Sequence, residues 1–379
     1  MHFEFATAAR VVFGEGEARR LAEIADIRDC RALVVTGSQP ARFEPLVAKL
    51  SHSIFSVTGE PSLDSVRAGL EQARGEGCGA VIAIGGGSAI DAGKAIAALL
   101  TNPGEALDYL EVIGGGQPLT RPSAPFYALP TTAGSGAEVT RNAVLASPAH
   151  RVKASLRSPY LLPRAAIVDP ELTSGLPRAA TASTGLDAVT QLIEPYVSIR
   201  AGAMTDLLCV EGLRRAQSCL ERAWENGADR EARAGMSWAS LLGGMALANA
   251  GLGAVHAFAA PIGGQWKAPH GAICAAVLPH AMEINIEALR KRAPASAALR
   301  RYDQIARILT RQPHAIAGDG VLWIGDLCDR LEIPPLGAYG VTAGDLDDIC
   351  KKAAQTSSMK GNPIALTPEE LREIALRAL

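Results

Sequence analysis

The side chains of this chain best suited to chemistry are two histidines and one aspartate. His256 lies within the longest uncharged stretch, residues 234–266, where an imidazole has few partners, and His270 follows shortly after it. Asp187 lies well upstream. Imidazole and carboxylate are both common ligands of divalent metal ions, so the three residues could form one metal site. Any one of these histidines taken alone would equally fit a buried residue that hydrogen-bonds its neighbours.

A glycine-rich turn in the first half of the chain indicates a nucleotide. Gly85-Gly86-Gly87-Ser88 follows the apolar run 80–84 and precedes the helix-like segment 89–100. Without Cβ atoms, such a turn brings backbone N–H groups at a helix N-terminus close to a diphosphate. Ser88 would add a hydroxyl donor or cap the helix, and a plain strand-to-helix turn capped by Ser88 fits the same residues. The pattern is not GxGxxG, so an ordinary Rossmann fold is not predicted.

A second polar segment follows another apolar run. Residues 130–140 read PTTAGSGAEVT, with the hydroxyls of Thr131, Thr132 and Ser135 beside two glycines. Such groups suit a diphosphate or a ribose, although a simple loop has a similar composition. Two such segments at the carboxyl ends of strands fit the crevice where open α/β sheets bind ligands.

The elements that must position these residues change in character along the chain. Apolar runs alternate with amphipathic segments in the first half, which predicts βαβ units and a mostly parallel sheet. Beyond Asp169-Pro170 the pattern is helical, and Thr367-Pro368 with Glu370 reads as the start of the last helix. We therefore expect an α/β domain over residues 1–165 and an all-helical domain over residues 166–379. The strands are expected at 10–13, 32–35, 54–57, 80–84, 127–129 and 166–168, with helices at 17–27, 62–74 and 89–100.

Composition excludes several classes of protein. The chain has 379 residues, 48% of them hydrophobic, and a net charge of −2, which gives no reason to expect nucleic acid or an anionic membrane as partner. Its 7 cysteines include no CxxC pair, so we expect reduced thiols and no cysteine-based metal site. The N-terminus lacks a signal-peptide pattern, which predicts a cytoplasmic protein. The uncharged stretch 239–265 is expected to be a buried helix that leads into an irregular loop rather than a membrane span.

Four motifs together resemble the iron-containing (group III) alcohol dehydrogenases. They are GGGSAIDAGKAIA, PTTAGSGAEVT, the helix around Asp187, and HAFAAPIGG followed by APHG, in the order usual for that family. Glycerol dehydrogenase, maleylacetate reductase and, more distantly, dehydroquinate synthase belong to the same superfamily. The resemblance implies a dehydroquinate synthase-like fold, a homodimer, NAD(P) as cofactor and a divalent ion, Fe or Zn, on Asp187, His256 and His270. It also implies cofactor contacts at Gly86, Gly87, Ser88, Thr131, Thr132, Ser135 and Lys153.

The chain departs from the family pattern at three places. The family's metal-binding histidine one turn after the aspartate is Gln191 here, and a Gln amide oxygen is a weaker ligand. A further histidine common in relatives, four residues after His256, is Ala260, which leaves the proton route open. After the second strand, NAD-preferring relatives have an acidic residue, whereas this chain has Thr36-Gly37-Ser38 with Arg42 further on. We take Ser38 as a cofactor contact and expect NADP at least to be tolerated.

The predicted function is reversible hydride transfer between NAD(P) and a small alcohol, aldehyde or ketone, catalysed with a metal on Asp187, Gln191, His256 and His270. Asp91 and Glu138 are expected to anchor loops or cap helices rather than to react. Three alternatives remain open at this point. One is a metal-independent enzyme like maleylacetate reductase, with Arg141, Lys153 or Lys267 holding carboxylates. The others are a lyase like dehydroquinate synthase and a non-catalytic nucleotide sensor.

Overall fold

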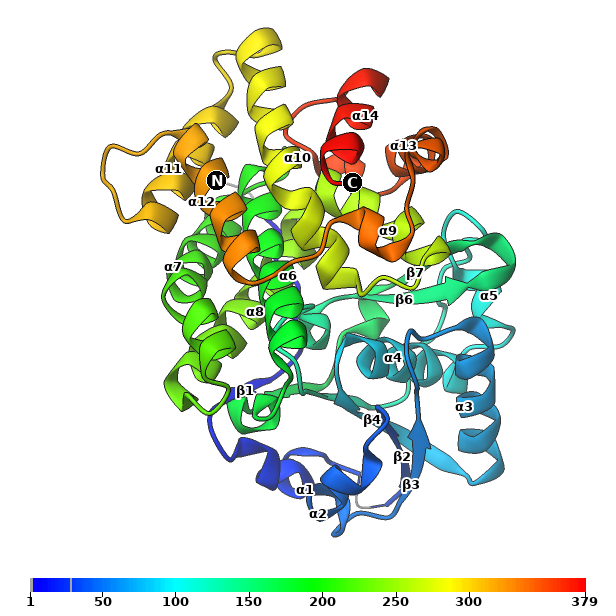
Figure 1. The fold of residues 1–379 in the computed structure, drawn as a ribbon. Coiled ribbons are helices and arrows are strands. Elements are labelled where there is room, and N and C mark those ends of the chain that lie inside the picture. The colour runs from blue at the N-terminus through cyan, green and yellow to red at the C-terminus, as the bar shows by residue number, and fades with distance from the viewer. Residues whose placement is uncertain (1–2, 28) are drawn as a thin grey trace. The chain divides into compact units, whose positions relative to one another are not determined.

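The computed structural model describes residues 3–27 and 29–379, which divide into two compact units. The α/β unit contains Ala6–Thr132 and Gly136–Ser174. The helical unit contains Ala133–Ser135 and Gly175–Leu379 together with residues 3–5. In Figure 1 the α/β unit runs from blue to green-cyan, and the helical unit continues from green to red. The predicted domain boundary near residue 165 stays a prediction.

The α/β unit is built on one parallel sheet and one hairpin. The sheet has six strands in the order β1-β8-β5-β4-β2-β3, all parallel to their neighbours. The strands are β1 (Val11–Phe13), β2 (Arg31–Thr36), β3 (His52–Ser56), β4 (Cys78–Gly85), β5 (Phe126–Pro130), β6 (Asn142–Ser147), β7 (Val152–Arg157) and β8 (Ala165–Val168). All six predicted strands are present, which confirms the predicted parallel α/β class.

The helices of the α/β unit cover both faces of the sheet. They are α1 (Leu21–Ile24), α2 (Glu44–Val47), α3 (Leu63–Gly75), α4 (Gly87–Thr101) and α5 (Ala106–Tyr109). Alternate residues of one strand point to opposite faces. Leu33 and Val35 accordingly join the cluster that contains α3 and α4, whereas Ala32 and Val34 pack with α1 and α2. Both faces are therefore buried, as parallel sheets require.

The order of the strands identifies a ligand-binding edge. From β2 the chain moves outward to β3, then returns to the other side of β2 to form β4. This reversal makes the boundary between β2 and β4 the topological switch point, where open α/β sheets bind ligands beyond the strand carboxyl ends. Thr36 ends β2 and Gly85 ends β4, so the residues that follow these two strands, Gly37-Ser38 and Gly86-Gly87-Ser88, begin at this edge.

The structure contains an antiparallel hairpin of β6 and β7 that the sequence did not predict. Its inward residues, Ala143 and Leu145, are buried against the α3 and α4 side of the sheet. The connection is Pro148–His150 followed by Arg151, whose φ of 51° is left-handed although it is not glycine. A hairpin turn with no Asn-Gly or Gly-X signal gives little warning in the sequence.

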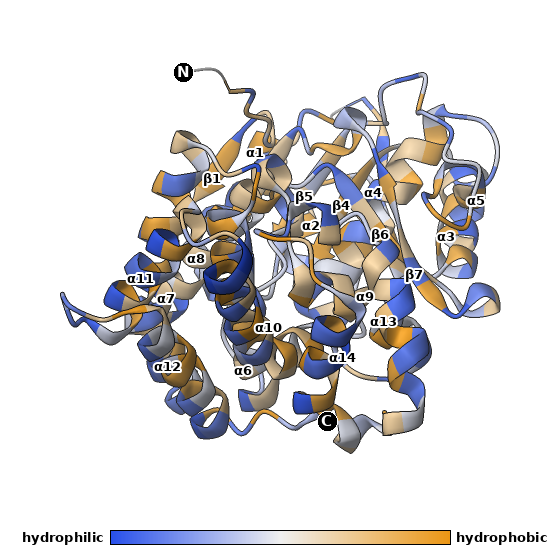
Figure 2. Cartoon of the chain, turned by 90° about the horizontal axis from the view of Figure 1, so that it is seen from above, coloured by the Kyte–Doolittle hydropathy of each residue, from blue (hydrophilic) through white to orange (hydrophobic). Residues whose placement is uncertain are grey.

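The helical unit consists of long helices around one apolar cluster. They are α6 (Arg178–Val197), α7 (Ala203–Glu225), α8 (Arg230–Ala250), α9 (Ala254–Gln265), α10 (His270–Arg292), α11 (Ala297–Thr310), α12 (Ala317–Arg330), α13 (Leu346–Gln355) and α14 (Pro368–Arg377). Hydrophilic and hydrophobic residues alternate along the more peripheral α11, α12 and α14 (Figure 2). The predicted start of α14 is confirmed, because the Thr367 side chain accepts from the Glu370 N–H in a capping box.

Two parts of the helical unit are long and apolar enough to be compared with membrane spans. One is α10, and the other is the pair of α8 and α9, which are bent by 100° at the break between them. The apolar window of α10 is 72% buried within the protein, as in a core helix. The irregular loop expected after the uncharged helix is much shorter than predicted. Only residues 251–253 are irregular, and His256 lies on the regular helix α9.

Candidate active site

Helix α6 places three polar side chains on one buried face. Asp187, Gln191 and Glu194 are separated by four and then three residues, so they project from the same side of the helix. All three are buried, at 4%, 3% and 6% exposure. Buried carboxylates need partners, and those of Asp187 and Glu194 come from α9 and α10.

The first turn of α9 is fixed by Glu194. One carboxylate oxygen accepts from the Val255 N–H at 2.7 Å, and the other lies 2.7 Å from His256 Nδ1. An ionised carboxylate only accepts hydrogen bonds, so Nδ1 carries the proton. His256 Nε2 is thereby directed away from Glu194. It lies 3.3 Å from Asp187 Oδ1.

Helix α10 begins at His270 and comes very close to α6. A Cβ on Gly271 would lie 2.3 Å from the Ser183 carbonyl oxygen, so only glycine permits this approach. His270 Nε2 then lies 3.9 Å from Asp187 Oδ1, and its ring centre lies 5.4 Å from that of His256. The His270 side chain is 36% exposed, against 6% for His256, so solvent reaches the cluster on the His270 side.

Cys274 is a fourth potential ligand, although the sequence predicts no cysteine-based metal site. It lies one helical turn after His270 and is fully buried. Its Sγ is 3.7 Å from His270 Nε2, and the ligand atoms of Asp187, His256, His270 and Cys274 all lie within 4.8 Å of one another. The signal in the sequence is the spacing His-x3-Cys on a helix, which has no CxxC pair to draw attention to it.

The charges of this cluster favour a cation. Burial alone would lower the pKa of the His256 imidazole, but Cys274, Asp187 and Glu194 hold that pKa well above its usual value. Burial likewise raises the pKa of Asp187, but the adjacent His256 and His270 bring it below the ordinary value. The cluster therefore has a negative potential, which a proton or a metal ion can neutralise.

The donor atoms fit a divalent metal ion. Asp187 Oδ1, His256 Nε2 and Gln191 Oε1 are buried and have no hydrogen-bond partner among the described residues. Asp187 Oδ1 and His256 Nε2 are close but not aligned for a hydrogen bond. Unpartnered buried polar atoms cost free energy, and an ion between them removes that cost. Glu194 behind His256 completes the carboxylate–histidine pair that commonly orients a metal ligand.

Some of the residues predicted to bind the cofactor lie in the turns that follow β4 and β5 in the α/β unit. No side chain caps the N-terminus of α4, whose N-cap residue is Gly86. Ser88 is thus inside the first turn, and its predicted role as helix cap is wrong. A Cβ on Gly86 would lie 3.3 Å from Thr132 Cγ2, so the β4 and β5 turns adjoin. An uncapped helix N-terminus lined by hydroxyls fits a diphosphate.

The other predicted cofactor residues lie on other elements. Ser38 is exposed just after β2, at the same edge. Lys153 is buried on β7 and forms a 2.9 Å ion pair with Glu60, in the segment that follows β3. Ser135 belongs to the helical unit. Arg42 donates to the carbonyls of Leu172 and Ser174, so its guanidinium already has partners.

Buried polar and charged side chains connect α4, the helix that follows the glycine-rich turn, to residues 140–144. Lys94 Nζ on α4 donates to Thr140 Oγ1 and to the Asn142 carbonyl, both at 2.8 Å. Burial lowers the pKa of Lys94 to about 8 and raises that of Glu138 to about 7. The Asp91 carboxylate accepts from the Val144 N–H at 3.0 Å, which confirms its predicted anchoring role.

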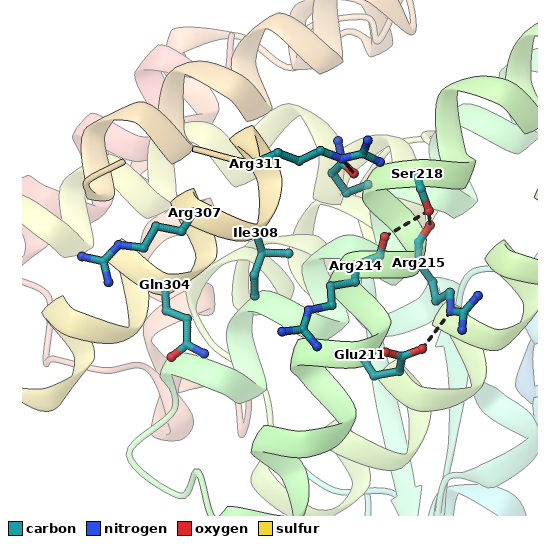
Figure 3. A pocket seen from close by; sticks show the side chains of 9 residues that line it. Glu211, Arg214, Arg215, Ser218, Gln304, Arg307, Ile308 and Arg311 are labelled. Carbon is teal, nitrogen blue, oxygen red and sulfur yellow. Dashed lines mark hydrogen bonds and ion pairs between the residues drawn. The ribbon is translucent and has the colours of Figure 1, made fainter. Parts of the chain in front are cut away.

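The helical unit also has a wide surface groove between α7 and α11, of about 740 Å³ (Figure 3). Four exposed arginines line it, and two of them already have side-chain partners: Arg215 pairs with Glu211, and Arg311 donates to Gln217. The lining side chains are Glu211, Arg214, Arg215, Gln217, Ser218, Gln304, Arg307, Ile308 and Arg311. None of the metal-ligand candidates is among them, so this groove is separate from the cluster around Asp187.

Comparison with known proteins identifies the family. Residues 8–170 match the model of the iron-containing alcohol dehydrogenases, and residues 181–379 match the C-terminal model of the same family. The chain belongs to the iron-containing alcohol dehydrogenase family. It is an alcohol dehydrogenase-type oxidoreductase, and the reading as a non-catalytic sensor is thereby set aside.

Individual relatives of this chain are named for different alcohols. Alcohol dehydrogenase 4 of Schizosaccharomyces pombe is 36% identical over 86% of this chain and 75% of its own length. 4-Hydroxybutyrate dehydrogenase of Cupriavidus necator is 35% identical over 86% of this chain and 84% of its own. A crystal structure of 1,3-propanediol oxidoreductase superposes with a TM-score of 0.90 at 30% identity, covering 100% of both chains. These matches confirm the predicted two-part fold.

Proposed function

We propose that this enzyme transfers a hydride reversibly between NAD(P) and a small alcohol, aldehyde or ketone with the help of a divalent metal ion. The observation that carries the proposal is the pair of buried, unpartnered atoms Asp187 Oδ1 and His256 Nε2, which face each other 3.3 Å apart. Two lone pairs in that arrangement call for a positive charge between them. A sulfoacetaldehyde reductase of Bifidobacterium kashiwanohense crystallised with NAD+ has the same fold, with a TM-score of 0.86 at 27% identity over 99% of this chain and 98% of its own.

Each residue of the metal cluster has a proposed role. Asp187, His256 and His270 would hold the ion, and Gln191 would lie beside them. The ion would polarise the carbonyl oxygen of the substrate as a Lewis acid. Glu194 keeps the Nδ1 proton of His256 in place and so aims Nε2 at the ion. The exposed side of His270 is where a small substrate would enter.

The α/β unit would bind the dinucleotide, which supplies or accepts the hydride. The N–H groups of Gly87 and Ser88 at the uncapped start of α4 would bind the diphosphate. Gly86 would leave room for it, and the hydroxyls of Thr131 and Thr132 would line the same edge. Ser38, Ser135 and Lys153 complete the proposed contacts. NAD and NADP both remain candidates, because Gly37 offers no carboxylate against a 2′-phosphate and Arg42 is already engaged.

The test combines metal analysis with turnover. We expect the purified protein to contain close to one Fe or Zn per chain and to oxidise NADH or NADPH with a panel of small aldehydes. Chelation should abolish this activity, and added metal should restore it. An Asp187→Asn variant, which keeps the shape and removes the charge, should bind the ion far more weakly. Asp326→Asn, at an exposed position of α12, is the matched control.

Two outcomes would contradict the proposal. Metal-free protein with full turnover would favour the alternative in which an unsaturated oxo-acid is reduced without a metal, as in maleylacetate reductases. That alternative needs free cations for the substrate carboxylates, and the ion pair of Lys153 with Glu60 counts against one of them. Loaded protein without any dehydrogenase activity would contradict the assigned reaction itself.

We further propose, on the family resemblance, that the enzyme is a cytoplasmic homodimer whose partners are small molecules rather than nucleic acid or membrane. Residues 1–165 and 166–379 are proposed to be its dinucleotide-binding and metal-binding domains. Sedimentation analysis of the purified chain would test the dimer directly.

A further inference from the structure

Cys274 lies within ligand distance of the same atoms that call for an ion. Its Sγ is fully buried on α10 and lies 3.7 Å from His270 Nε2. Independently of the cysteine, Asp187 Oδ1 and His256 Nε2 are buried, lack partners and belong to the same group of atoms within 4.8 Å. The thiol therefore adjoins a place that already requires a positive charge.

We propose that Cys274 is a ligand of the divalent ion, as a thiolate, and that the ion is zinc. Cys274 would then supply the fourth protein donor, because the family's metal-binding histidine is replaced by Gln191 in this chain. Soft thiolate ligands favour zinc over the harder ions that prefer oxygen. The inference rests on the proposed metal site and assigns to this chain a donor set of one carboxylate, two imidazoles and one thiolate.

Three of the distances between the donors are equal to those around a tetrahedral ion or slightly longer. With Zn–N and Zn–O bonds near 2.0–2.1 Å and a Zn–S bond near 2.3 Å, two donors lie about 3.3–3.6 Å apart. The observed separations are 3.3 Å for His256 Nε2 to Asp187 Oδ1, 3.9 Å for His270 Nε2 to Asp187 Oδ1, and 3.7 Å for His270 Nε2 to Cys274 Sγ. Zinc can accept a fifth ligand during reaction, so four protein donors are compatible with catalysis.

Charge distinguishes Cys274 from Gln191 as the fourth donor. A thiolate would place a second negative charge directly on the ion beside that of Asp187, whereas Gln191 offers only a neutral amide oxygen, which is a weaker ligand. Gln191 would then lie beside the donors, while Cys274 binds the ion.

X-ray absorption at the zinc edge tests this assignment on the full-length, zinc-loaded protein. We expect a sulfur shell at about 2.3 Å in the wild type, absent in Cys274→Ser. The matched control is Cys209→Ser, another fully buried cysteine, on α7. Zinc affinity, from competition with a chromophoric chelator, should fall by more than the roughly 10–100-fold typical of an outer-shell loss in Cys274→Ser. Gln191→Ala should keep the sulfur shell.

The wild-type spectrum decides the question even if a variant folds poorly. Zinc bound with only nitrogen and oxygen neighbours would overturn the thiolate assignment while leaving the metal site intact. Loss of zinc in Gln191→Ala but not in Cys274→Ser would do the same and make Gln191 the fourth ligand. Wild-type protein that binds no metal and still turns over would overturn the proposed function as well, so the two failures are distinguishable.

Discussion

At the scale of single residues, Glu194 orients the candidate metal site although it is not one of the proposed metal ligands. It holds the Val255 backbone and the His256 ring with its two oxygens, each at 2.7 Å. It therefore sets both where α9 begins and which nitrogen of His256 carries the proton. We regard it as a positioning residue, since it acts on the reaction only through His256.

The variant Glu194→Gln is expected to weaken metal binding by about 10–100-fold, because outer-shell partners of metal-binding histidines have effects of that size. The amide preserves the volume but can donate to Nδ1, which moves the proton to Nε2 and blocks the lone pair. Chelator competition measures the change. Glu287→Gln, at an exposed position of α10, is the control, and equal affinities in both variants would contradict the positioning role.

At the scale of secondary structure elements, the contact between α6 and α10 depends on the absence of one side chain. A Cβ at Gly271 would lie 2.3 Å from the Ser183 oxygen and 3.3 Å from Asp187 Cβ. Gly271→Ala must therefore separate the two helices beside His270. We expect a loss of about 1–3 kcal/mol of stability, as for other overpacked cores, together with weaker metal binding. Gly318→Ala on α12, with nothing within 4 Å, should cost little and serves as control.

That prediction fails if Gly271→Ala binds metal as tightly as the wild type. Thermal unfolding and metal titration on the same samples separate loss of stability from loss of the site. A variant that melts earlier but retains its metal affinity would show that α10 can shift without moving His270.

The support beneath the glycine-rich turn should appear as a pH dependence of stability. The pKa of Glu138 is about 7 in the folded protein against 4.5 in the unfolded chain. Between these values the folded state keeps a proton that the unfolded state releases, so stability falls as pH rises from 4.5 to 7. The 2.5-unit difference corresponds to at most ~3 kcal/mol.

Glu138→Gln removes this titration. The free energy of unfolding of the variant, relative to that of the wild type, should therefore rise by up to ~3 kcal/mol between about pH 5 and pH 8, as measured by denaturant unfolding at both values. Glu71→Gln, at an exposed position of α3, is the control. A constant difference between variant and wild type across this range would show that Glu138 does not titrate there.

The elements also show what the sequence could reveal. Buried parallel strands are continuous apolar runs, so all six strands of the sheet could be located, and the histidine and glycine motifs could be found from residue type alone. The β6–β7 hairpin could not, because its turn lacks glycine at the left-handed Arg151. Cys274 and Glu194 were not recognised because their roles come from contacts between α6, α9 and α10, which no local pattern encodes.

At the scale of the whole molecule, the two proposed ligands would stabilise different parts of the chain. The candidate metal ligands Asp187, His256, His270 and Cys274 all belong to the helical unit. The glycine-rich turn of β4 and α4 and the hydroxyls of Thr131 and Thr132 belong to the α/β unit. A ligand stabilises only the folded form that binds it, by about 2.7 kcal/mol at a hundred times its Kd.

Hydrogen exchange resolves these effects because it reports the opening of each region separately. Metal ions added to the metal-free protein should slow exchange about 100-fold in α6, α9 and α10, at a free concentration a hundred times the Kd. NADH or NADPH at the corresponding concentration should slow it mainly around β2, β4 and the start of α4. Equal protection of both units by either ligand would mean that they open as one cooperative body. No change in α6, α9 and α10 with metal would place the ion elsewhere. The Asp187→Asn variant is the control for the metal effect: it should lose the protection by metal and keep the protection by the dinucleotide.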